Sequence, residues 1–206
     1  MLKEKPQPIF SYRYFILYKP FKVLCQFSPL NSKKTLKNIF DFPKDVYPVG
    51  RLDEESEGLL ILTNDSSLNN KLLHPVNEHA RTYLVQLDGK ITDEAIKKLE
   101  IGFSISVRGE KHKTKSALVK LLNEEPRVPV RNPPIRFRNN IPTSWIELTL
   151  SEGKNHQVRK MTAAVGFPTL RLIRWKIEKL TADNMLSGDV IEMERKEILS
   201  LLKLNK

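Results

Sequence analysis

An acidic turn directly before an apolar run is the first segment of this sequence whose side chains are suited to chemistry. It reads Gly50-Arg51-Leu52-Asp53-Glu54-Glu55-Ser56-Glu57-Gly58, and four apolar residues follow at 59–62. Carboxylates gathered in this way can bind a hard cation such as Mg²⁺, or they can face water in a turn. The clustering alone leaves both interpretations open, a magnesium cluster and a solvated loop with Asp53 as a turn residue.

A second segment, residues 152–160, combines amide, imidazole and basic side chains in the order Glu-Gly-Lys-Asn-His-Gln-Val-Arg-Lys. From Gly153 to Lys176 the chain holds six basic residues and no acidic one. Such a run can be only a solvated face. However, apolar residues at 158, 161 and 165 have helical spacing, so we expect a helix capped by Asn155 and ended by Gly166. The first backbone N–H groups of this helix would form a favourable binding site for phosphate. These amides belong to Asn155, His156 and Gln157.

Other kinds of site are missing from the sequence. It has no glycine-rich phosphate loop, no dinucleotide fingerprint and no Gly-x-Ser-x-Gly nucleophile elbow. The four histidines share no metal-ligand spacing, and Cys25, the single cysteine, cannot form an internal disulfide or a thiolate zinc cage. We expect Cys25 to be a small core residue.

The composition favours a globular protein with a polyanionic partner. Thirty-five Lys and Arg against 24 Asp and Glu give 206 residues a formal charge of +11 and a pI near 9.7. The 40% hydrophobic and 29% charged content excludes wholesale disorder. No apolar run is long enough to span a membrane, and the N-terminus lacks a secretory signal. We therefore expect a cytoplasmic protein without a membrane partner.

The pattern of apolar and turn residues predicts an α+β fold with a mostly antiparallel mixed sheet and peripheral helices, since regular βαβ alternation is absent. Residues 126–138 are an exception, because their four prolines exclude a helix or a central strand. We expect an extended, arginine-rich loop there. The predicted strands are 14–18, 58–63, 81–88, 144–150, 168–177 and 189–194. The predicted helices begin at Asp65 or Ser66, at Thr92, at Asn155 and at Lys196.

Five motifs in order resemble the pseudouridine synthases, and most closely the family of ribosomal small-subunit pseudouridine synthase A. The loop at 131–138 and the junction at 166–168 resemble the large-subunit synthase E branch of that family. The resemblance covers Tyr14 to the end, so we divide the chain into a leader, 1–13, and a catalytic domain, 14–206. Thirteen residues are too few for the S4-type RNA-binding module of most relatives, so we expect the catalytic domain's own loops to select the RNA. The motifs are Tyr18–Phe21, Gly50–Asp53 with Glu57–Asp65, Arg81–Val85, Glu152–Met161 and Pro168–Arg174.

The resemblance implies a monomeric enzyme that isomerises uridine to pseudouridine in ribosomal RNA, in 23S rRNA or a large-subunit precursor, with no metal and no cofactor. Asp53 would be the catalytic carboxylate, attacking the sugar carbon or removing a ribose proton. Arg159 would be its ion-pair partner, and Tyr83 would stack on the uracil. His156 replaces the basic residue expected before Gln-Val-Arg. The expected substrate or RNA contacts are Lys19, Arg51, Arg131, Arg136, Arg138, Lys154, Asn155, His156, Gln157, Lys160, Leu172 and Arg174.

Two other functions stay open at this point. One is a catalytically silent protein that binds ribosomal RNA or assists ribosome assembly. The other is a metal-dependent nuclease that uses the acidic residues between Asp53 and Glu57.

Overall fold

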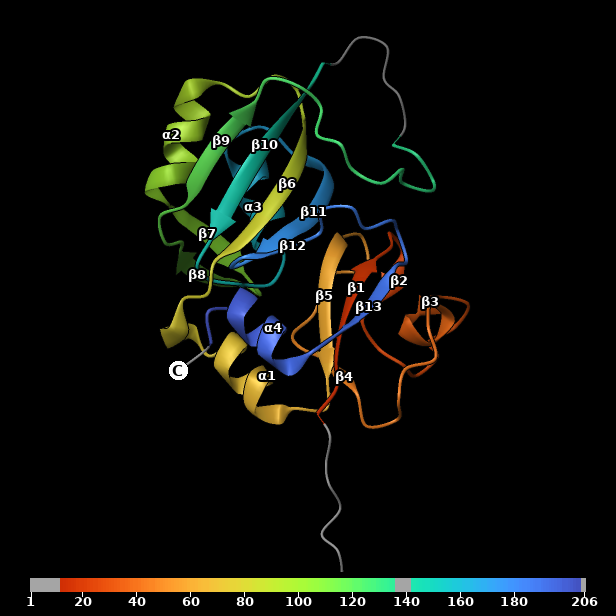
Figure 1. Ribbon diagram of the computed structural model, residues 1–206. Coiled ribbons are helices and arrows are strands. Elements are labelled where there is room, and N and C mark those ends of the chain that lie inside the picture. Colours follow the sequence, from red (N-terminus) through yellow and green to blue (C-terminus); the bar gives the residue numbers. More distant parts are fainter. Residues whose placement is uncertain (1–11, 136–141, 205–206) are drawn as a thin grey trace, which may run out of the picture.

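The computed structural model describes residues 12–135 and 142–204, and strands supply most of its ordered elements (Figure 1). The strands run β1 Tyr14–Lys19, β2 Val23–Leu24, β3 Lys34–Thr35, β4 Tyr47–Pro48, β5 Glu57–Thr63, β6 Arg81–Asp88, β7 Ser104–Val107, β8 Glu110–Lys113, β9 Leu118–Leu122, β10 Thr143–Leu150, β11 Thr169–Ile177, β12 Leu180–Thr181 and β13 Val190–Met193.

The helices begin at polar caps where the sequence supplies them. The Asp65 carboxylate accepts from the backbone N–H groups of Ser67 and Leu68, and the Thr92 hydroxyl accepts from that of Ala95. The sequence predicted helix starts at Asp65 or Ser66 and at Thr92, and the structure confirms both, with Asp65 rather than Ser66 as the first cap. None of the described helices is long and apolar enough to cross a membrane. The helices are α1 Ser66–Leu73, α2 Asp93–Ile101, α3 Gln157–Ala164 and α4 Arg195–Leu201, with short 3-10 turns η1 Leu36–Asn38 and η2 Pro75–Asn77.

A nine-stranded sheet joins two halves of the molecule. Its strand order is β13-β1-β5-β11-β6-β10-β9, with β4 on β5 and β12 on β11. β5 and β11 run parallel, whereas β1–β5 and β6–β11 are antiparallel. The expected α+β fold with a mostly antiparallel mixed sheet is therefore confirmed. Figure 1 shows β13 and α4, late in the chain, lying beside the early strands β1 and β5.

Three apolar clusters hold this sheet. One extends along a face of both halves and packs α1 and α4 against residues such as Tyr14 and Ile173. Another packs α2 and α3 on β6 and β10, and the last packs residues 23–46 on the second face of β1 and β5. β1 and β5 are consequently buried on both faces, which explains their uninterrupted apolar sequences.

The parallel contact between β5 and β11 is short and unusually close. Its register pairs Glu57 with Ile173 and Gly58 with Arg174. Gly58 has a φ of +97°, and a Cβ at this position would lie 2.3 Å from the backbone oxygen of Arg174. Only glycine satisfies both conditions. Because the 50–58 turn enters β5 at this point, the contact also fixes that turn against β11.

The region 104–122 holds β7, β8 and β9, which the sequence pattern did not reveal. Strands β7 and β8 expose most of their side chains, so they lack a sustained apolar alternation. A two-residue turn joins them, and Arg108 and Gly109 both have positive φ, 54° and 87°.

The prediction that Asn155 caps the third helix is wrong. His156 precedes Gln157 in the left-handed region, φ 52°, so the helix begins later and has no side-chain cap.

We expect Gly58→Ala to lower the free energy of unfolding by about 3 kcal/mol or more, because the methyl group must displace backbone while φ stays positive. Gly188→Ala is the matched control. Its φ is +96°, and a Cβ there meets nothing within 4 Å, so its cost is only the strain of about 1 kcal/mol. Urea denaturation of both variants measures the difference, and equal losses would contradict the close-approach argument.

Candidate active site

A cleft of about 580 Å³ opens where the two halves of the sheet meet. Its walls come from the 50–56 turn, β6, β11 and the segment 150–158. Asp53, Tyr83 and Leu172, which the resemblance placed around a uracil, all line it. Segments far apart in the sequence thus converge on one cavity, although the roles of these residues toward a base stay predictions.

The acidic residues of the 53–57 turn do not share one cation site. Each carboxylate has a different basic partner, at 2.6–3.3 Å between the ionic atoms. Across the described residues, no group of three or more His, Cys, Asp and Glu side chains is arranged to hold a metal ion. The described carboxylates of this turn are thus each held by a separate basic side chain rather than gathered around one position. The pairs are Asp53 with His156, Glu54 with Lys33, Glu55 with Lys22 and Glu57 with Arg171.

The Glu57–Arg171 pair is buried beneath the cleft. Arg171 donates from Nε and Nη2 to the two Glu57 oxygens at 2.8 and 2.9 Å, and the Glu57 side chain is only 1% exposed. A third bond, from Nη2 to the Pro129 carbonyl at 2.7 Å, attaches the proline-rich segment that begins at residue 126 to β11. The residue types alone leave Glu57 in a turn that is either a magnesium cluster or a solvated loop, and they put Arg171 in a basic run that can be a solvated face. Both residues lie on strands whose apolar neighbours are fully buried, and this pattern could have indicated that the two charged side chains are buried as well.

Lys19 is fully buried, so the prediction that it contacts RNA is wrong. Its ammonium group donates to the carbonyls of Pro20 and Val23, both at 2.8 Å, and to that of Glu54 at 3.3 Å. Burial lowers the pKa of Lys19 to about 8. Through its bond to the carbonyl of Glu54, the residue that follows Asp53, Lys19 stabilises the acidic turn from the interior of the protein.

Arg159 does not form the predicted direct ion pair with Asp53. Its Nη2 donates to the backbone carbonyl of Glu55 at 2.8 Å, while Asp53 Oδ2 lies 3.3 Å from Nδ1 of His156. The late start of α3 explains this, because His156 occupies the position next to Asp53 and Arg159 lies over the turn. Burial lowers the pKa of Arg159, and the Glu55 and Asp53 charges act in the opposite direction. Arg159 Nε is buried without a hydrogen-bond partner in the described part of the chain.

Gln157 is also buried, although it lines the cleft, and its contact with RNA stays a prediction. Its side-chain oxygen accepts from the Lys154 N–H at 2.9 Å, and its nitrogen donates to Glu152 at 2.7 Å. Glu152 in turn contacts His112 at 3.0 Å. This network shapes the turn before α3. The neighbouring side chains Lys154, Asn155 and His156 are exposed and line the cleft, as expected of substrate contacts.

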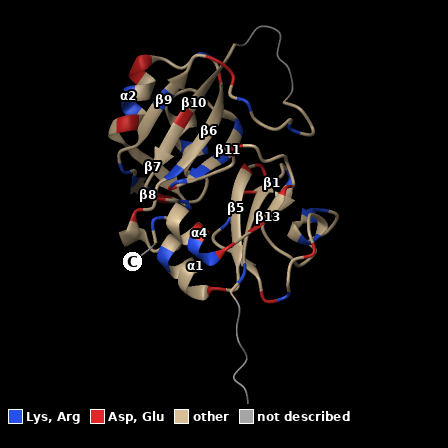
Figure 2. Cartoon of the chain, in the orientation of Figure 1, with Lys and Arg blue, Asp and Glu red and all other residues tan. Residues whose placement is uncertain are grey.

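Strand β11 provides a polar group inside the cleft. Arg174 lies opposite Tyr83 in the β6–β11 register, and its Nε donates to the Leu59 carbonyl at 2.8 Å. Its Nη2 is buried and has no hydrogen-bond partner among the described residues. Arg174 therefore combines a structural contact with a second, buried donor that has no partner among the described residues. Figure 2 shows Lys and Arg on β6 and β11 near the junction of the two halves.

The remaining predicted contacts lie at the margins of the cleft. Arg51 is exposed and lines it, and Lys160 is half-buried on α3 beside a second hollow. The Arg131 guanidinium lies over the ring of Phe21, 4.0 Å from its centroid, and donates to the Pro133 carbonyl. Arg136 and Arg138 lie outside the described residues. Cys25 is half-buried and accepts the Leu52 N–H at 3.3 Å.

Comparison with known proteins gives consistent matches across the chain. The family model described as RNA pseudouridylate synthase matches residues 13–164. Ribosomal large subunit pseudouridine synthase E of Vibrio parahaemolyticus is 41% identical over 93% of this chain and 78% of that protein. Ribosomal small subunit pseudouridine synthase A of Haemophilus influenzae is 30% identical over 93% and 74%. A crystal structure of a pseudouridylate synthase aligns with a TM-score of 0.75 and 30% identity, over 93% of this chain and 74% of that one.

We expect Glu57→Met and Arg171→Met each to lower the free energy of unfolding by about 3–5 kcal/mol, because each leaves a buried charge without its partner. The double variant should lose far less than the sum, giving a coupling energy of about 3 kcal/mol. Arg13 and Glu192 form a similar two-bond pair with side chains 42% and 47% exposed, and the same cycle there should give at most about 1 kcal/mol. Equal coupling at both pairs would show that burial does not matter.

Proposed function

The chain belongs to the RNA pseudouridylate synthase family, and from that premise we propose that it converts uridine to pseudouridine in ribosomal RNA, specifically in 23S rRNA or its large-subunit precursor. The 41% identity to a large-subunit synthase, against 30% to a small-subunit synthase, supports the choice of subunit. An RNA substrate of this kind agrees with the expected cytoplasmic location and with the net charge of +11. We expect the enzyme to act as a monomer.

The observation that carries this proposal is the convergence of Asp53, Tyr83 and Leu172 on one cleft. In the reaction the bond from ribose C1′ to uracil N1 breaks, the base turns, and a bond from C1′ to C5 of the base forms, while C5 gives up its proton and N1 takes one up. Positive charge develops on the sugar as the first bond breaks, and a carboxylate can stabilise it. Asp53 can attack the sugar carbon or accept a ribose proton. Tyr83 and Leu172 would hold the ring between them while it turns.

The contacts around Asp53 support this role. Arg159 bonds to Glu55 and Lys19 bonds to Glu54, so the backbone that follows Asp53 is anchored on two sides. When the base fills the cleft and displaces water, an ionised carboxylate becomes less stable unless positive charge lies nearby. Arg159, which interacts electrostatically with Asp53, can supply that charge.

The target uridine must leave its stack to enter the cleft, at a cost of a few kcal/mol. Exposed polar groups at the rim, Arg51, Lys154 and Asn155, can offset this cost by binding phosphates. We therefore expect activity on RNA to fall as the salt concentration rises.

We expect Asp53→Asn to reduce pseudouridine formation by at least about 10³-fold, because the amide retains the shape of the side chain and removes its charge. Tritium release from RNA labelled at C5 of uridine, measured in EDTA, provides the assay. Asp41→Asn, at an exposed aspartate, is the control and should retain full activity. A wild-type protein that binds rRNA without releasing tritium would be a silent binder, and cleavage of the RNA that EDTA abolishes would indicate a metal-dependent nuclease.

We expect Arg159→Lys to lower kcat by about 10²-fold, since an ammonium group cannot reach the Glu55 carbonyl and face Asp53 with the same geometry. Arg127→Lys, at an exposed arginine, should leave kcat unchanged. Single-turnover kinetics on saturating rRNA transcript separates this effect from binding. Retention of the wild-type rate by Arg159→Lys would mean that Arg159 is only a point charge.

A further inference from the structure

A second hollow lies between the β7–β8 hairpin and α3. It has a volume of about 670 Å³ and is open to solvent. The hairpin contributes Ser104, Ser106 and Gly109, and the helix contributes Ala163 and Ala164. We call it the hairpin groove.

The hairpin groove continues the catalytic cleft. Arg108 and Asn155 line both cavities, Arg108 from the tip of the hairpin and Asn155 from the turn before α3. A chain that leaves the cleft past these residues therefore enters the groove directly. Polymeric RNA must leave the cleft on both sides of a nucleotide that is bound inside it.

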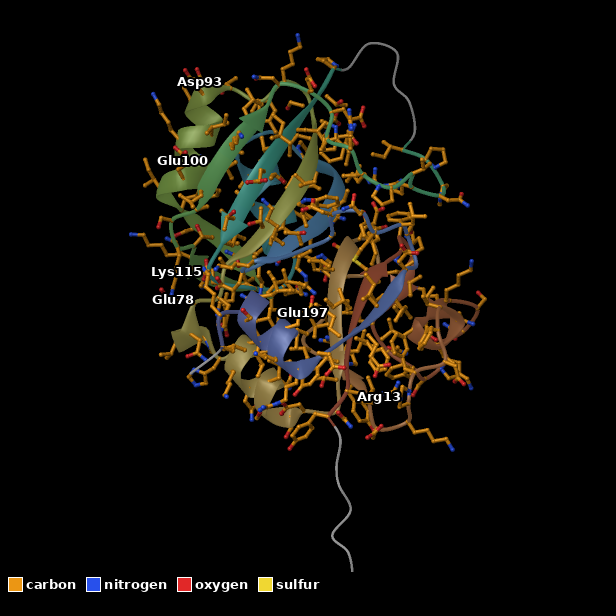
Figure 3. All side chains as sticks on the ribbon, in the orientation of Figure 1. Arg13, Glu78, Asp93, Glu100, Lys115 and Glu197 are labelled. Carbon is orange, nitrogen blue, oxygen red and sulfur yellow. The ribbon has the colours of Figure 1, made fainter. Side chains whose placement is uncertain are left out.

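The charge of the groove suits an anionic chain. Arg108 and Lys160 line it and no acidic side chain does; in the described part of the chain, neither cation has an ion-pair partner. Glu152 pairs with His112 and Glu78 pairs with Lys115, while Glu110, next to Gly109, is exposed on β8 and does not line the groove. Figure 3 labels Glu78 and Lys115, whose side chains meet beside η2. The groove cations thus remain available to an external partner.

Small residues line most of the groove, and two of them are serines with hydroxyl groups. A Cβ on Gly109 would meet nothing within 4 Å, and Ala163 and Ala164 are exposed without a bulky side chain. Ser104 and Ser106 are exposed on β7 and can donate to phosphate or ribose oxygens. Among residues 12–135 and 142–204, no aromatic side chain lines the groove, so this part of the chain gives it no stacking platform for bases. It therefore matches a sugar–phosphate backbone better than nucleobases.

We propose that the hairpin groove holds the backbone of the unpaired RNA strand on one side of the target uridine, with Arg108 and Lys160 binding its phosphates. This inference rests on the proposed function, since it requires RNA in the cleft. An unpaired strand fits because the target nucleotide has to be extruded or single-stranded, and because recognition of RNA by proteins favours such segments. Contacts of this kind set affinity and register rather than base choice.

The test compares Arg108→Ala/Lys160→Ala with Lys97→Ala/Lys196→Ala, which removes the same charge from exposed positions outside both cavities. The substrate is a 23S rRNA transcript labelled with tritium at C5 of uridine. We expect the groove variant to raise KM about tenfold and to leave kcat within about twofold. The slope of log KM against log salt should fall by about 1.4, because two single-strand phosphate contacts are lost. The control variant should match the wild type in KM and salt slope.

Transcripts shortened from either side of the modified uridine locate the strand. The KM defect should disappear for the transcript that lacks the flank in the groove and persist for the transcript that lacks the other flank. Ala164→Glu, which adds a negative charge at an exposed helix position, should give the same flank dependence. A groove variant with wild-type KM and salt slope, or a defect independent of both flanks, would overturn the inference. A wild-type protein that forms no pseudouridine would instead overturn the proposed function.

Discussion

The close parallel approach of β5 to β11 is the constraint on which the rest of the molecule depends. At Gly58 the two backbones are too near for any side chain, and one residue earlier Glu57 bonds to Arg171. This contact joins the two halves of the sheet and sets where the acidic turn ends. The cleft lies at the same junction, so the position of Asp53 relative to Tyr83 and Leu172 follows from how the halves meet.

Much of the fold could be predicted from the sequence because local signals agreed with the final structure. Buried strands such as β1 and β5 have continuous apolar runs, and α1 and α2 have polar caps. The β7–β8 hairpin could not be recognised, since its exposed strands are stabilised by pairing and a positive-φ turn rather than by an apolar pattern. The start of α3 was misplaced because His156, in a left-handed conformation, replaces the expected cap.

The site was predicted less completely, because residue type does not reveal the direction of a side chain. Asp53, Tyr83 and Leu172 were located through motif order, and they do share a cavity. Lys19, however, was expected to contact RNA, and Arg171 was counted in a basic run that can be a solvated face, although both are buried and bonded to backbone or carboxylate oxygens. The direct Arg159–Asp53 contact failed for a similar reason, since motif spacing cannot specify which carbonyl a guanidinium meets.

The last strand of the sheet, β13, pairs with the first, β1, and this pairing has a consequence for folding during synthesis. β13 covers the outer edge of β1, and Arg195 at the start of α4 donates to the Tyr14 hydroxyl at 3.2 Å. Because strands are made in order, β1 keeps an unpaired edge until the last strand of the sheet has left the ribosomal exit tunnel. The half that carries Asp53 therefore completes its part of the sheet only after Val190–Met193 has been translated and has paired with β1.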